Sequence, residues 1–311
     1  LRADISQFYP SIYTHTIPWA LHTKKVAKAS ISDTKLAGNL LDQELRGCQQ
    51  GQTKGVPIGP DTSLGIAELV LAIVDRAIEK DAKPIGGVRF IDDMEFSFAN
   101  LAQAEAALLT LEASLHDFEL QLNPTKTRIV ELPDVFDSRY VTDIRSSIPQ
   151  GGSTARSPWI DYFNRAFSLA REFPADGVLR YAVASLQHTP IPKKHWELVQ
   201  SLLWQSVTGD AGCLRFVIDV LLVNALAHKG MELDKKMAED SINALIFRNT
   251  VIEHGSEVVW GIWAALLFKL KLSDTSLVLS SKMDDSFVAT IVQLAIEHGV
   301  FAEDYPSEKW L

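Results

Sequence analysis

The sequence predicts an α+β domain with a small antiparallel sheet, followed by an all-α, repeat-like domain. Short stretches that alternate apolar and polar residues occur within the first domain, most clearly at 88–91 and 95–98. Beyond residue 159, apolar residues recur at helical spacing and no strand pattern is convincing. The region between, 146–158 (SSIPQGGSTARSP), has the Ser, Gly and Pro content of a linker. We therefore expect one domain over 1–145 and a second over 159–311.

The composition is that of a globular protein. Of 311 residues, 47% are hydrophobic and 22% are charged, as in a typical folded chain. The formal charge of −9 gives no general attraction to nucleic acid or to an anionic membrane. Two cysteines are too few for a disulfide framework, and no apolar run reaches the roughly 18 residues of a membrane span. We expect a cytoplasmic protein without a membrane partner, whose start at Leu1 lies inside a domain.

The elements of the first domain follow from apolar spacing and helix-start signals. The first 13 residues are rich in Ile, Phe and Tyr, and they predict a strand that ends in a turn. A helix is expected from Thr16, because the proline two residues later is tolerated in a first turn. Leucines at helical spacing predict a helix over 35–50. Ser63 is the candidate N-cap of an apolar helix over 64–80.

A β-hairpin is expected around Asp92 and Asp93, because both flanking arms alternate apolar and polar side chains. A helix over 101–118 follows, with leucines on one face, and then a short strand over 127–132. The helices expected in the second domain span 159–173, 176–187, 194–208, 211–228, 233–250, 255–271 and 284–298. Their short connections are similar to those of an array of antiparallel helix pairs.

Three acids form the candidate catalytic centre: Asp4 on the first strand, and Asp92 and Asp93 at the hairpin turn. Carboxylates at a turn are commonly solvated turn formers. Here the adjacent pair lies between two apolar arms, where like charges destabilise each other unless a cation is present. Mg²⁺ prefers oxygen ligands, and two such ions form a clamp for in-line phosphoryl transfer.

Four motifs resemble those of reverse transcriptases and occur in the order of that family. Residues 4–12 (DISQFYPSI) are similar to the first palm motif, and residues 90–93 (FIDD) are similar to the aromatic-x-Asp-Asp motif. Residues 55–63 (GVPIGPDTS) resemble the Pro-Gln-Gly loop and its helix, and 120–127 (LQLNPTKT) resemble the Leu-Asn-Pro-x-Lys-Thr motif. The resemblance covers 1–132 and implies a polymerase palm whose fingers would precede Leu1.

The resemblance implies nucleotidyl transfer, with DNA synthesised from dNTPs. Asp4 and Asp92 would ligate two Mg²⁺ ions, for which Mn²⁺ can substitute. The carbonyl of Ile5 would be a further ligand, and Asp93 a neighbouring or partial one. Lys126 would lie near the triphosphate, where a cation stabilises the leaving pyrophosphate. A solvated surface lysine is the alternative interpretation of Lys126.

The resemblance also implies substrate-binding residues. Tyr9 matches the aromatic side chain that excludes a ribose 2′-hydroxyl, although a structural tyrosine and an exchange of roles with Phe8 both stay open. Gly59 would let the backbone approach the nucleotide or template. Ile58 stands where the family usually has glutamine, so template reading is expected to differ. Phe90, in the motif that carries two of the acids, is the last of the substrate-binding residues that the resemblance implies.

Features outside the four motifs are similar to bacterial abortive-infection and other defence-associated reverse transcriptases. A helical, acidic region stands in place of a basic thumb, and the variants IPWALH (17–22) and PIGPDTS (57–63) are similar to that group. The resemblance implies a role in antiphage defence in the bacterial cytoplasm. The implied partners are RNA, DNA or a protein primer, together with a homo-oligomer formed through the helical domain.

Two alternatives stay open on the sequence alone. A palm kept only as a scaffold would bind partners through the helical domain, and a nuclease could use the same acids. His15 and His22 lack an acidic partner at metal-ligand spacing and are interpreted as structural.

Overall fold

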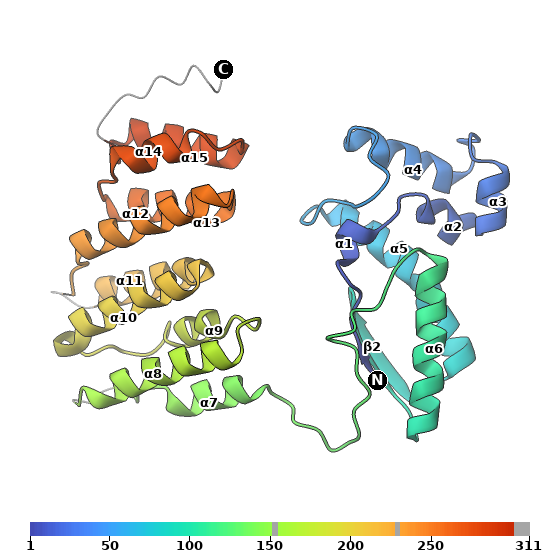
Figure 1. Ribbon diagram of the computed structural model, residues 1–311, viewed down its shortest axis with the longest axis horizontal. Coiled ribbons are helices and arrows are strands. Elements are labelled where there is room, and N and C mark those ends of the chain that lie inside the picture. Colours follow the sequence, from blue (N-terminus) through green and yellow to red (C-terminus); the bar gives the residue numbers. More distant parts are fainter. Residues whose placement is uncertain (151–154, 228–230, 302–311) are drawn as a thin grey trace. The chain divides into compact units, whose positions relative to one another are not determined.

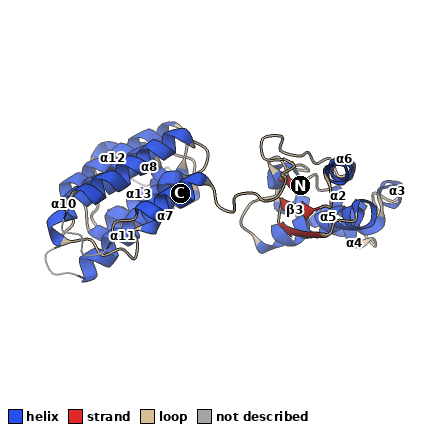
Figure 2. Ribbon diagram, turned by 90° about the horizontal axis from the view of Figure 1, so that it is seen from below, coloured by secondary structure: helices blue, strands red, loops and turns tan. Residues whose placement is uncertain are grey.

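The computed structural model describes residues 1–150, 155–227 and 231–301 (Figure 1). It contains two compact units, Leu1–Asp134 and Val135–Leu311, which are described separately. The three strands found in the described residues all lie in the first unit, and the second unit is helical (Figure 2). These findings confirm the α+β class expected from the sequence.

The division between the units falls at Asp134, before the expected limit at residue 145. Helix α7 (Arg139–Ser147), which the apolar spacing did not indicate, belongs to the second unit and packs against α8 (Ser157–Glu172). Residues 151–154 of the expected linker lie outside the described residues. The domain limits drawn from the sequence stay a prediction.

The sheet of the first unit has the order β1 (Arg2–Ala3), β3 (Asp93–Ser97), β2 (Gly86–Phe90). Both pairings are antiparallel, so the hairpin expected around the adjacent acids is confirmed. Ala3 pairs with Met94, which places the end of β1 beside the start of β3. Asp4 therefore leaves the sheet close to the hairpin turn.

Two expected strands are far shorter than predicted. The strand expected over 1–13 is reduced to β1, because the chain turns at Gln7, whose φ is 44°, and enters the short helix α1 (Phe8–Ser11). The strand expected over 127–132 is reduced to one bridge between Arg2 and Arg128. The composition of these segments suits a strand, but the two residues of β1 offer too short a partner for a longer ladder.

The first unit also contains five helices that are longer than α1: α2 (Thr16–His22), α3 (Lys24–Ala29), α4 (Ala37–Cys48), α5 (Asp61–Ala77) and α6 (Leu101–Asp117). The expected cap at Ser63 is wrong, since α5 begins directly after Pro60 and Ser63 is a buried residue inside it. The fixed φ of Pro60 suits the N-cap position and allows the earlier start. A single π-helical turn (Ile78–Ala82) extends α5.

The core of the first unit lies between the sheet and the helices α5 and α6. Met94 is 2% exposed, and it shares one cluster of buried apolar side chains with Ile5, Leu71 and Leu111. Burying each of these side chains stabilises the unit by about 1.5–3 kcal/mol. The residues beside Asp4 and Asp93 are therefore fixed by packing from behind, which leaves the acids at the rim of the core.

The second unit is a succession of helices that stack on one another (Figure 1). After α7 and α8 it contains α9 (Val178–Ser185), α10 (Trp196–Gly209), α11 (Leu214–Ala227), α12 (Lys235–Val251), α13 (Gly255–Phe268), α14 (Asp274–Ser280) and α15 (Ser286–Glu297). Contacts join α12 to α13 and α13 to α15, and α10 to α12 and α12 to α14. In the described part of the chain, no helix combines the length and apolar character needed to cross a membrane.

Candidate active site

Asp4 is the most buried of the three predicted acids, with a side chain 8% exposed. The segment that carries the fourth motif returns beside it, because Asn123 donates its backbone N–H to the Asp4 carbonyl at 2.8 Å. Asn123 Nδ2 also donates to Asp4 Oδ1 at 3.0 Å, and Lys126 Nζ donates to Asp4 Oδ2 at 2.8 Å. Asn123 and Lys126 thus orient this carboxylate from one side.

The carbonyl of Ile5 has a defined direction. Ile5 forms a single antiparallel bridge with Leu122, and the bonds of that bridge are made by the flanking residues. Ser6 donates to Gln121, and Asp4 accepts from the residue after Leu122. In such a pair the central residue directs its own carbonyl away from the partner segment. The Ile5 carbonyl is therefore not used in this pairing.

The hairpin turn consists of Ile91 and Asp92, between the paired residues Phe90 and Asp93. Ile91 has a φ of 56°, which β-branched residues rarely adopt, and such a conformation costs about 1–3 kcal/mol. Arg89 Nη1 donates to the Ile91 carbonyl at 2.9 Å and holds the strained residue in place. The turn presents Asp92 at its tip and Asp93 at the first position of β3.

Arg89 also ties the hairpin to α5. Its guanidinium donates to both oxygens of Glu68 at 2.8 Å, and it forms bonds of 2.7–3.1 Å to Asp75. The hydrogen bonds to Glu68 are the main reason that the pKa of Arg89 is raised, and those to Asp75 raise it further. The same bonds lower the pKa of Glu68. Arg89 is not among the site residues predicted from the sequence. A basic residue in an otherwise apolar strand, with two acids two helical turns apart on α5, is the signal that could have indicated it.

The three acids and Lys126 are electrostatically coupled. Burial is the main reason that the pKa of Asp92 is raised, and the charges of Asp4 and Asp93 raise it further. The hydrogen bond to Asp4 is the main reason that the pKa of Lys126 is raised, and the charges of all three acids act in the same direction. The structure thus brings together the four residues that the sequence predicted as catalytic.

The donor chemistry of this cluster fits a hard divalent cation. Its ligands are carboxylate oxygens in excess over the one lysine. Burial is the main cause of the raised pKa of Asp92, and a cation would offset the additional repulsion from Asp4 and Asp93. Each Asp4 oxygen keeps a second acceptor position beside the bonds to Asn123 and Lys126. Within 1–150, 155–227 and 231–301, however, no three Asp, Glu, His or Cys side chains are grouped closely enough to hold a metal ion.

The two aromatic residues of the first motif have different surroundings. Phe8 is 3% exposed and belongs to the core, whereas Tyr9 is only partly buried. Their ring centroids are 5.4 Å apart. Of the two, Tyr9 is the ring that can reach a substrate, and its role as a gate stays a prediction.

The other predicted substrate-binding residues are open to solvent. Ile58 is 74% exposed and Phe90 is 75% exposed. Gly59 has a φ of 123°, a conformation that side-chain-bearing residues rarely adopt, and no atom lies within 4 Å of the position its Cβ would take. Gly59 and Ile58 therefore lie on an exposed loop ahead of α5, where a ligand has room to approach.

The small antiparallel sheet with acids at its hairpin, backed by α5 and α6, agrees with the palm architecture expected from the sequence. The family model of reverse transcriptase (RNA-dependent DNA polymerase) matches residues 1–157 of the 311. The chain belongs to this family. The matched segment extends past Asp134 and includes α7 of the second unit. No curated protein matches the chain.

Proposed function

We propose that this chain synthesises DNA from dNTPs in a Mg²⁺-dependent reaction. The observation that carries the proposal is the coupling of Asp4, Asp92, Asp93 and Lys126 at the rim of the sheet. Asp4, Asp92 and Asp93, with the carbonyl of Ile5, would hold the ions. When bound, Mg²⁺ would activate the primer hydroxyl and stabilise charge on the phosphates.

The residues of the chain supply orientation and charge. Asn123 holds Asp4 in one orientation, and Arg89 holds the hairpin that carries the other two acids. Lys126 is 63% exposed, so its ammonium group can leave Asp4 and turn toward the triphosphate of a nucleotide. Tyr9 would contact the sugar and exclude a ribose 2′-hydroxyl.

The test is nucleotide incorporation by the full chain in Mg²⁺, with and without an RNA template. The variant Asp92→Ala/Asp93→Ala should incorporate no dNTP, whereas Glu105→Ala, on the exposed face of α6, should match the wild type. Incorporation by the double variant would end the proposal. Acid-dependent synthesis without a template would identify an untemplated polymerase, with which Ile58 in place of glutamine is compatible.

We also propose that the activity serves antiphage defence in the bacterial cytoplasm, with the helical unit forming a homo-oligomer. The defence-like sequence variants and the stacked helices after the palm support this proposal. Phage plating on cells that express the chain should show protection, and the double acid variant should lose it. Protection that survives loss of the acids would favour the scaffold function instead.

A further inference from the structure

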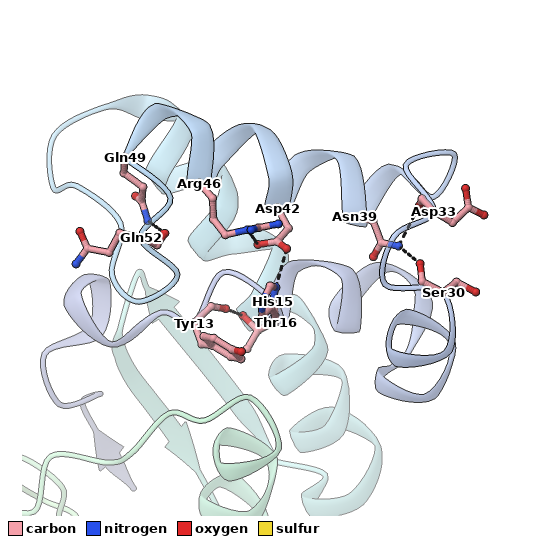
Figure 3. A network of polar contacts seen from close by, with 10 residues as sticks. All are labelled: Tyr13, His15, Thr16, Ser30, Asp33, Asn39, Asp42, Arg46, Gln49 and Gln52. Atoms are coloured by element: carbon pink, nitrogen blue, oxygen red, sulfur yellow. Dashed lines mark hydrogen bonds and ion pairs between the residues drawn. The ribbon is translucent and has the colours of Figure 1, made fainter.

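A polar network joins the turn before α2 to the middle of α4 (Figure 3). His15 Nδ1 donates to Asp42 Oδ2 at 2.6 Å, and Arg46 Nε donates to Asp42 Oδ1 at 3.2 Å. Because a carboxylate only accepts, Asp42 selects the form of His15 that carries a proton on Nδ1. The Asp42 side chain is 6% exposed, so solvent screens this pair far less than a surface ion pair.

The interface between α2 and α4 depends on such polar contacts. The buried face of α4 consists of Gly38, Asn39 and Asp42. A Cβ on Gly38 would lie 2.6 Å from Pro18 Cα, so the two backbones approach closely. Across this interface the Gly38 amide donates to His22 Nε2 at 3.0 Å. Asn39 Nδ2, in contrast, donates to the Ser30 carbonyl at 2.7 Å, in the connection between α3 and α4. Leu45, one turn after Asp42, is partly buried against the core, and the hydrogen bonds of Asp42 fix the position of α4 beside this apolar contact.

The C-terminal end of α4 leads into a loop that holds the backbone of Tyr9. Gln49 follows α4, and its Nε2 donates to the Gly55 carbonyl at 3.0 Å. The Gly55 amide donates to the Ile12 carbonyl at 2.8 Å, and the Val56 amide donates to the Tyr9 carbonyl at 3.0 Å. The loop is therefore bonded to α4 on one side and to the segment that carries Tyr9 on the other.

We propose that His15 and Asp42 are a positioning pair for nucleotide selection. The pair sets the position of α4, and the position of α4 sets that of the loop over 53–56. The loop in turn fixes the position of the Tyr9 backbone. The ring of Tyr9 is then held where it meets the sugar of an incoming nucleotide. Neither His15 nor Asp42 touches the substrate in this scheme, which rests on the proposed polymerase function.

The chain offers a matched pair of variants on one face of α4. Asp42→Ala and Asn39→Ala each remove a buried polar side chain, but only Asp42 bonds His15 and Arg46, whereas Asn39 bonds carbonyls of the connection ahead of α4. Asp42→Ala should raise KM for dNTP roughly 10- to 100-fold and narrow the preference for dNTP over rNTP, with a smaller change in kcat. Asn39→Ala should leave the KM for dNTP and the preference for dNTP over rNTP near those of the wild type. Equal effects of the two variants on this preference would overturn the proposal.

A second measurement does not depend on catalysis. Hydrogen exchange of the full chain should show faster exchange at the Gly55 and Val56 amides in Asp42→Ala than in Asn39→Ala. Unchanged exchange would overturn the positioning role, whereas a wild-type chain that incorporates no nucleotide would instead overturn the proposed function. Asp42→Asn keeps the shape of the side chain, so it replaces Asp42→Ala if that variant does not fold, with the same expected direction.

Discussion

At the scale of single residues, the candidate site shows where sequence reasoning succeeds. Asp4, Asp92 and Asp93 could be predicted because acids in apolar surroundings are unusual, and Lys126 because of the motif around it. The role of Asn123 could not be predicted, because its partner Asp4 lies 119 residues away in the sequence. Arg89 was missed although a basic residue in an apolar strand is a signal, because its partners lie on another element, 14 and 21 residues away. The contact between His15 and Asp42 was missed for the same reason, since it joins residues 27 apart.

Lys126 stands where a cation would act on Asp4, which makes it a competitor of a metal ion. We expect Lys126→Met to bind Mn²⁺ up to about fivefold more tightly, because a largely exposed ion pair contributes up to ~1 kcal/mol. The same variant should incorporate nucleotides more slowly, since the charge near the leaving pyrophosphate is lost. Calorimetric titration with Mn²⁺ measures the first effect, and Lys80→Met, on the exposed end of the α5 region, is the control. Weaker Mn²⁺ binding by Lys126→Met would mean that the lysine chiefly orients Asp4.

The raised pKa of Asp92 predicts a pH-dependent gain in stability for Asp92→Asn. Above its folded-state pKa, ionised Asp92 destabilises the folded chain through burial and through the charges of Asp4 and Asp93. Asp92→Asn should therefore be more stable near neutral pH, by less than about 1 kcal/mol because solvent screens this partly exposed group. The gain should shrink as the pH falls from the folded-state pKa to the ordinary value for aspartate, because the proton then neutralises the wild-type side chain. Thermal unfolding across this pH range measures the difference in stability between Asp92→Asn and the wild type. A difference that stays constant at every pH would contradict the prediction.

At the scale of elements, local patterns predicted the hairpin and the longer helices, but not the elements that depend on distant partners. The alternation around Asp92 and Asp93 was sufficient for β2 and β3. The brevity of β1 could not be predicted, because its length depends on Met94 and Glu95 rather than on its own composition. Helix α7 contains few apolar residues and α14 has only seven residues, so both gave too weak a signal of apolar spacing.

The hairpin depends on Arg89 as a link to α5. Arg89→Ala would leave Glu68, Asp75 and the Ile91 carbonyl without this donor, and we expect a loss of about 1–3 kcal/mol of stability with a decrease in nucleotide incorporation. Arg89→Lys should recover little of the lost stability or incorporation, because an ammonium group cannot form the paired bonds of a guanidinium. Thermal unfolding and incorporation assays measure both effects, with Arg76→Ala on the exposed side of α5 as the control. Full activity in Arg89→Lys would show that charge alone holds the turn.

At the scale of the whole molecule, the two units have separate apolar cores. The core around Leu111 and Met94 belongs to the first unit, and the core around Leu245 and Ile262 belongs to the second. The predicted acids all lie in the first unit, so metal binding should stabilise that unit, whereas packing defects in the helical array should act on the second. The fold class could be predicted from the sequence because each core has its own pattern of apolar spacing.

This separation predicts independent responses to a core defect and to a metal. Leu245→Ala, at a fully buried position of α12, should lower the stability of the second unit by about 2–5 kcal/mol. Added Mn²⁺ should still stabilise the first unit of this variant as in the wild type, because binding to a folded site stabilises only the unit that contains it. Leu111→Ala, in α6, should have the opposite pattern, with a weakened first unit and an unchanged second one. Hydrogen exchange resolved by peptide measures each unit in the full chain. If Leu245→Ala abolished the effect of Mn²⁺ on the first unit, the site at Asp4 and Asp92 would depend on the helical array, and the two units would have to be treated as one cooperative body.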